Sequence, residues 1–158
     1  MKLNVDTAII DKFTVLVVVV QDETGEVISA WARQYVLCDP MQTKATLILW
    51  ALQLVQVEEF HEIIVEAWKE MLKHVFDALK SSLSNIEWSM STLLSNVLEL
   101  SSGCVSCDFG WVRRDANFVA QALAKYASIN RSLIRCNMFS FPPSIFMEVR
   151  EDGCVFGF

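Results

Sequence analysis

Hydrophobic and polar residues at the start of the chain follow the pattern of β-strands. The segment Phe13–Val20 is a nearly continuous apolar run, rich in valine and broken only by Thr14. Stiff β-branched side chains in such a run favour a strand that is buried on both faces. Strand-like segments at Lys2–Ile10 and Glu26–Val36 flank it, and a turn ending in Gly25 separates the second segment from the third. The first 36 residues therefore predict three consecutive strands, with a hairpin over residues 13–35.

Helical and strand-like segments alternate in the rest of the chain. Asp39 and Pro40 are typical of a helix N-cap and first turn, and apolar residues at helical spacing continue to about Glu59. The pattern then predicts strands at His61–Ala67 and Cys104–Val112, and helices at Lys69–Ser82, Asn85–Leu100 and Asp115–Ala127. This order predicts an α/β fold with a mixed five-stranded sheet, in which the first three strands form an antiparallel meander and helices cover both faces.

Length and composition favour one folded domain. The chain has 158 residues, of which 53% are hydrophobic and 20% charged, so a disordered or low-complexity chain is excluded. A sheet covered on both faces accounts for much of the apolar excess. We place the domain at residues 1–128, followed by an apolar tail at 129–158 that either packs on the domain or binds a protein partner through residues 134–158.

Targeting signals are not evident in the sequence. A membrane-spanning helix needs about 20 consecutive apolar residues, and no run of that length occurs. The residues that follow Met1 lead directly into strand-like sequence without a secretory signal. We therefore expect a cytoplasmic or nuclear protein that does not bind membranes.

Ordinary catalytic and metal-binding patterns are weak in this chain. The five cysteines are an odd number, which argues against a disulfide framework, and the spacing of Cys104 and Cys107 is more often structural than metal-binding. His61 and His74 are isolated in the sequence, and no glycine-rich phosphate loop occurs. With 19 acidic and 13 basic residues, the net charge of −6 also disfavours the binding of a polyanion.

Five short motifs nevertheless occur in a recognisable order: Leu3-Asn-Val-Asp6, Gln21-Asp-Glu-Thr-Gly-Glu-Val27, Leu49-Trp-Ala-Leu52, Ile64-Val-Glu66 and the segment Trp111–Lys125. Together they resemble the ribonuclease H type-1 domains of plant non-LTR retrotransposons and their reverse-transcriptase-like relatives, over residues 2 to 128. The resemblance implies a three-layer α/β/α ribonuclease H-like fold and cleavage of the RNA strand of an RNA–DNA hybrid. It also implies four carboxylates that hold two magnesium ions, which activate a water and stabilise the leaving oxygen.

This chain retains one of the four acids that the resemblance implies. Asp6 matches the acid of the first strand, whereas the other three positions fall on Lys44, Trp68 and Gln121. Glu66, two residues before Trp68, is a weak candidate for a replacement acid. A lysine about 4 Å from a dication is repelled by about 8 kcal/mol at an effective dielectric of about 20. We therefore expect an inactive site without a cofactor, in which Asp6 at most contacts a metal.

Nucleic-acid binding can persist without catalysis. Arg113, Arg114 and Asn117 stand at the start of the last predicted helix, beside the cleft that the resemblance implies, and a helix N-terminus attracts phosphate. We expect weak, salt-dependent binding of an RNA–DNA hybrid or another nucleic acid. A protein-interaction module and a non-functional retrotransposon remnant remain as alternatives.

Overall fold

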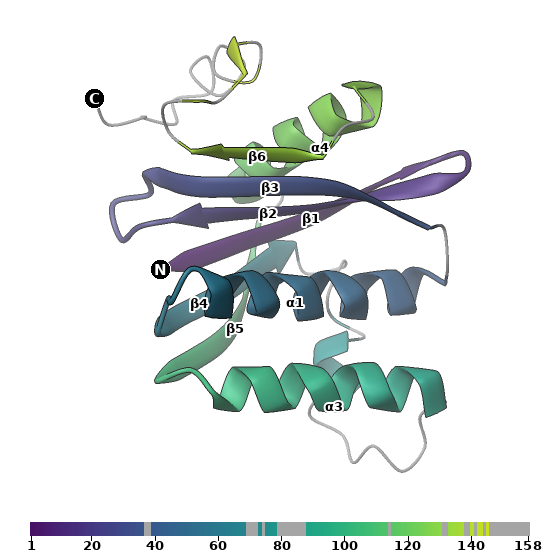
Figure 1. Cartoon of the computed structure of the whole chain (residues 1–158), viewed down its shortest axis with the longest axis vertical. Helices are drawn as coiled ribbons and strands as arrows, with labels where there is room; N and C mark the ends of the chain where they lie inside the picture. The colour runs from purple at the N-terminus through teal and green to yellow at the C-terminus, as the bar shows by residue number, and fades with distance from the viewer. Residues whose placement is uncertain are drawn as a thin grey trace.

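The computed structural model describes residues 1–36, 39–68, 73, 75–78, 88–113, 115–130, 133–137, 140, 142–143 and 145. These residues form one six-stranded sheet in the order β5-β4-β1-β2-β3-β6, with helices on both faces (Figure 1). The strands are β1 (Lys2–Ile10), β2 (Phe13–Gln21), β3 (Val27–Val36), β4 (Glu62–Trp68), β5 (Ser106–Val112) and β6 (Ile134–Asn137). The helices are α1 (Pro40–Val57), α3 (Trp88–Ser102) and α4 (Phe118–Asn130), and a 3-10 turn, η2 (Asp115–Asn117), precedes α4.

The sheet is mixed, as the sequence predicts. Strands β1, β2 and β3 form an antiparallel meander. Strand β4 then runs parallel to β1, and β5 runs parallel to β4. The β1–β4 register places Lys2 beside Ile64 and Asn4 beside Glu66.

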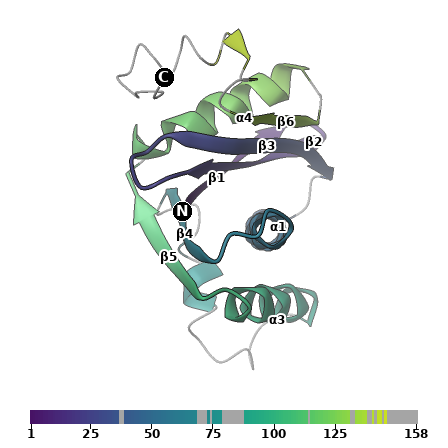
Figure 2. The ribbon, with the colours of Figure 1, turned by 60° about the vertical axis from the view of Figure 1, so that its left-hand side comes forward.

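Strand β2 explains the valine run. Its side chains alternate between two cores, so that Leu16, Val18 and Val20 pack toward α1, while Val15, Val17 and Val19 pack toward α4. All six side chains are buried. Figure 2 shows α1 and α4 on opposite sides of this part of the sheet. A strand covered on both faces needs apolar residues at consecutive positions, which is the pattern in the sequence.

Helix α1 begins where the sequence predicts. The Asp39 side chain accepts hydrogen bonds from the backbone N–H groups of Met41 and Gln42, at 2.8 and 3.1 Å, and Pro40 occupies the first turn. These bonds satisfy backbone donors that have no partner within the helix. The helix ends at Val57, and Glu59 takes a positive φ of 57° in the turn that leads to β4.

The structure differs from the sequence prediction mainly in the segment after α4. Strand β6, which the sequence did not predict, pairs with β3, and Ile134, Cys136 and Ile145 are buried on the α4 side of the sheet. This part of the apolar tail therefore packs on the domain. Most of the predicted helix at 69–82, the first three residues of the predicted helix at 85–100 and most of the tail lie outside the described residues.

Several element boundaries also shift. The predicted strand at 104–112 begins only at Ser106, so Cys104 precedes it, and the start of the last predicted helix is the turn η2. Among the described residues, no helix is both long enough and apolar enough to cross a membrane.

Candidate functional site

A pocket of about 370 Å³ lies between β1 and α4. Its polar lining residues are Asp6 and Thr7 of β1 together with Gln121 and Lys125 of α4, and its apolar lining residues are Ala8, Phe118, Ala122 and Ala124. Two of the four positions that the sequence singled out, Asp6 and Gln121, therefore lie around the same pocket. Gln121 and Lys125 are four residues apart and share one side of the helix.

Side-chain alternation along β1 directs Asp6 toward this pocket. Leu3 and Val5 are buried in the core on the α1 side, so Asn4, Asp6 and Ala8 face the α4 side. The recorded β1–β4 pairing ends at Asn4 and Glu66. Asp6 therefore stands on β1 just beyond the paired segment, where its side chain reaches the pocket.

Asn117 holds the start of α4 against β1. It is 1% exposed, and its Nδ2 donates a hydrogen bond of 3.1 Å to the backbone carbonyl of Val5, the residue before Asp6. The sequence placed Asn117 among the residues that contact nucleic acid. The structure instead places it in the interior, where it connects η2 to the strand that carries Asp6. A buried carbonyl without a partner is costly, so this bond fixes the geometry of the pocket.

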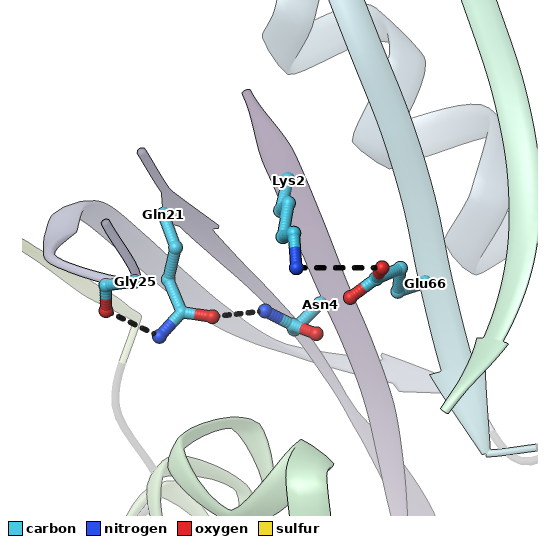
Figure 3. A network of polar contacts seen from close by, with 5 residues as sticks. All are labelled: Lys2, Asn4, Gln21, Gly25 and Glu66. Carbon is cyan, nitrogen blue, oxygen red and sulfur yellow. Dashed lines mark hydrogen bonds and ion pairs between the residues drawn. The ribbon is translucent and has the colours of Figure 1, made fainter. Parts of the chain in front are cut away.

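A polar network occupies the neighbouring surface of β1 and β4 (Figure 3). The Lys2 ammonium lies 3.8 Å from a carboxylate oxygen of Glu66. Asn4 donates a hydrogen bond to the side chain of Gln21, which in turn donates to the Gly25 carbonyl at 2.9 Å. Glu66, the weak replacement candidate, is thus paired with Lys2 at the level of Asn4.

The remaining predicted residues lie elsewhere. Trp68 ends β4 and packs against the core on the α1 side, and Lys44 is a partly buried residue of α1. Neither residue lines the Asp6 pocket. Arg113 is exposed between β5 and η2, while Arg114 lies outside the described residues.

The pocket's donor set does not match the demands of two magnesium ions. It offers one carboxylate, one hydroxyl, one amide and one ammonium, with a formal charge of zero, whereas hard dications need several anionic oxygens. Among the residues that the structure describes, no group of three or more His, Cys, Asp or Glu side chains is arranged to hold a metal ion. We therefore derive no metal-dependent step for this chain.

Sequence reasoning missed Lys125 as a site residue. Lys125 belongs to the motif that carried the resemblance, and its spacing of four residues from Gln121 was a usable signal. The Asn4–Gln21 contact had no such signal, because these residues lie on neighbouring strands and meet only through the β1–β2 register, in which Lys2 is opposite Gln21.

Comparison with known proteins agrees with this architecture. The reverse transcriptase-like family matches residues 4–127. No curated protein matches the chain significantly. Similar solved structures include ribonuclease H1 from the halophilic archaeon Halobacterium salinarum NRC-1, with a TM-score of 0.69 and 15% identity over 83% of this chain and 98% of that one. The N-terminal ribonuclease H domain of a Mycobacterium tuberculosis protein, solved as a fusion with maltose-binding protein, gives a TM-score of 0.66 and 14% identity over 83% and 97% of the two chains. The chain thus has the ribonuclease H-like fold, and it belongs to the reverse transcriptase-like family.

Proposed function

We propose that this chain is a nucleic-acid-binding domain of retrotransposon origin that has lost hybrid hydrolysis. The observation that carries the proposal is the lining of the Asp6 pocket, in which one carboxylate is accompanied by Gln121 and Lys125. Two-metal hydrolysis needs anions that surround both ions, and this set sums to zero charge. Lys44 and Trp68, at the other two positions that the resemblance assigns to acids, also provide no carboxylate.

Binding would use cations at the edge of the open sheet surface. Lys125 is exposed and lines the pocket, and Arg113 is exposed just before η2. Arg113 lies just before η2, and Lys125 belongs to α4. A phosphate backbone that follows this segment would therefore contact both charges. The net charge of −6 opposes a polyanion, so the affinity is expected to be low and to fall steeply with salt.

The proposal is tested with a labelled RNA–DNA hybrid, measured for binding by fluorescence anisotropy and for cleavage on a gel, with and without magnesium, over a salt series. We expect binding that weakens with salt and no magnesium-dependent cleavage. Lys125→Gln should weaken binding and reduce the salt slope by about one unit. Lys12→Gln, which removes an exposed cation from the β1–β2 turn outside the pocket lining, is the matched control.

Substituting acids at the altered positions tests the inactive-site part separately. Gln121→Asp, which adds a second carboxylate to the pocket lining beside Asp6, is expected to bind magnesium more tightly than the wild type by calorimetry, and Lys44→Glu, outside that lining, is the comparison variant. Robust magnesium-dependent cleavage by the wild-type protein would contradict the proposal. Absence of hybrid binding at low salt would instead favour a protein-interaction module or a remnant without a binding role.

A further inference from the structure

The two edges of the sheet differ in how they are protected. Strand β6 forms one edge with four residues, one of which, Arg135, is paired with Glu58 at 2.9 Å. Strand β5 forms the other edge with seven residues, all paired with β4 in an unbroken parallel register. In the sheet that the described residues form, no strand lies beyond β5 (Figure 2).

Strand β5 lacks the features that usually keep an exposed edge from pairing. Its sequence, Ser-Cys-Asp-Phe-Gly-Trp-Val, contains no proline, lysine or arginine, and Asp108 is its single charged residue. Its pairing with β4 shows no bulge that would turn the edge away. Unbroken and weakly charged edges of this kind are templates for a further strand.

We propose that β5 pairs antiparallel with β5 of a second copy of this chain. A two-fold axis perpendicular to the sheet keeps each side chain on its own face, so a residue can be opposite only a residue of the same face. The register centred on Phe109 pairs all seven residues. It places Ser106 opposite Val112 of the second copy, and Cys107 opposite Trp111.

Charge distinguishes this register from its neighbours. With Phe109 at the centre, Asp108 is opposite Gly110 of the second copy, so no like charges are opposed. Centring the axis on Asp108 would oppose two carboxylates and shorten the paired segment. Like charges directly opposite each other destabilise a strand pair, so the Phe109 register is favoured on both counts.

The side chains of β5 on the helix side are already held in place within one copy. The rings of Phe109 and Trp111 lie 5.1 and 5.0 Å from the ring of Phe76, centroid to centroid, although Trp111 remains 44% exposed. Pairing would bring Trp111 beside Cys107 of the second copy and cover its apolar surface, with little loss of side-chain freedom because the ring is already ordered. The result is one continuous sheet across two copies.

The test is sedimentation velocity of the full chain over a concentration series, with Gly110→Asp as the disrupting variant. A Cβ at Gly110 would meet only Glu66 Cγ and Ile64 Cγ2, each at 3.8 Å, so there is room for the side chain. In the dimer, the carboxylate introduced by this substitution would be opposite Asp108 twice, which should weaken association about tenfold. Asp108→Lys combined with Gly110→Asp places opposite charges in the same two positions and should restore association.

Two controls separate this contact from general effects. Both Gly110 variants place the same carboxylate beside Glu66 within one copy, so circular dichroism and melting at low concentration should report similar folding for the two. Gln34→Glu adds one negative charge at an exposed position of β3 and should leave association unchanged. Salt should strengthen pairing, because each copy carries a charge of −6, whereas nucleic-acid binding weakens with salt.

A chain that stays monomeric at every concentration would overturn the proposal. So would association that is unaffected by Gly110→Asp, or that is lost equally in the single and the double variant. The pairing does not depend on hybrid binding, so either result can fail without the other.

Discussion

The two halves of the sheet differ in how many of their faces are covered by helices. In the half formed by β1, β2 and β3, strand β2 is buried on both faces, and its residues from Thr14 to Val20 are at most 1% exposed. In the half formed by β4 and β5, the helices that the structure describes cover only the face toward α1 (Figure 2). Ile63 and Val65 are buried there, while Ile64, between them, is 37% exposed.

This difference locates the functional surface. A side chain of β2 reaches solvent only by opening a core, and from Val15 to Val20 the sequence of this strand is continuously apolar. On the β4–β5 half the same strands carry a covered face and an open face, and the open face holds the Lys2–Glu66 ion pair and Asp108. The Asp6 pocket lies at the boundary between the halves, where α4 ends the covered region. Polar side chains that could bind a ligand therefore lie on β1, β4 and β5, and not on the buried part of β2.

Truncation of one leucine should give the largest contrast between the halves. Leu16→Ala on β2 removes a fully buried side chain and should lower the free energy of unfolding by about 2–5 kcal/mol. Ile64→Ala on the open face of β4 is the matched control and should cost less than about 1 kcal/mol. Urea unfolding followed by circular dichroism measures both. Equal losses for the two variants would break the comparison, because they would mean that the open face of β4 is as well covered as β2.

Loss of the Asn117 side chain tests the boundary itself. Asn117→Ala leaves the Val5 carbonyl without its donor, and a buried unpaired group costs about 1–3 kcal/mol. Asn130→Ala removes a bond of similar length, 2.8 Å to the Tyr126 carbonyl, but at an exposed position, and should change stability by less than about 0.5 kcal/mol. The same urea titration compares the two. A negligible effect of Asn117→Ala would show that the bond does not hold α4 to β1.

The partly buried thiol of Cys107 and the buried thiol of Cys136 test whether the helix-side face of β5 is covered as well as the other half of the sheet. Burial raises the pKa of Cys107 to about 12, with Cys104 and Asp108 adding to the effect, and burial raises that of Cys136 in β6 to about 11. The thiolate is the reactive form, so at pH 8 both should react with iodoacetamide at least about tenfold more slowly in the folded protein than in urea. Mass spectrometry of the labelled peptides gives both rates. Fast labelling of Cys107 alone would mean that β5 is open on both faces.

The same shifts predict how stability depends on pH. Because the folded-state pKa of each thiol lies above its ordinary value of 9.0, the unfolded chain loses these protons first. The contribution of the two thiols is therefore complete below about pH 9 and decreases as the pH rises toward 11 and 12. Cys107→Ser and Cys136→Ser variants should show a smaller loss of stability over this alkaline range.

Most of the fold was predictable because its signals are local. The valine run, the turn ending in Gly25 and the cap at Asp39 each specify an element from a few neighbouring residues, and the structure has each of these elements where it was expected. Strand β6 was missed because its alternation of apolar and polar residues extends over only four positions, and these residues become a strand only through pairing with β3. Short segments of this kind depend on tertiary contacts, which a reading along the chain does not contain.

The candidate site was predictable only in part. The resemblance placed Asp6 and Gln121 at one site, and they line one pocket. Asn117 was predicted to contact nucleic acid, because an asparagine just before a helix is usually at the surface. In the structure it is buried and bonds to the backbone of Val5. The ion-pair partner of Glu66 could not be predicted from the sequence either. Lys2 and Glu66 are 64 positions apart and meet through the parallel register of β1 and β4.

The smallest expected effect comes from the Lys2–Glu66 ion pair on the open face. The atoms are 3.8 Å apart and the Lys2 side chain is 45% exposed, so solvent and salt screen the attraction. Glu66→Gln keeps the shape of the side chain and should change the free energy of unfolding by less than about 0.5 kcal/mol, with the difference vanishing at high salt. Lys2→Gln removes the same pair from the other side and serves as the control, because a true pair requires similar effects from both changes. A loss of several kcal/mol in Glu66→Gln would show that this carboxylate is as deeply embedded as a core residue, and the distinction between a covered and an open half would then end at β4.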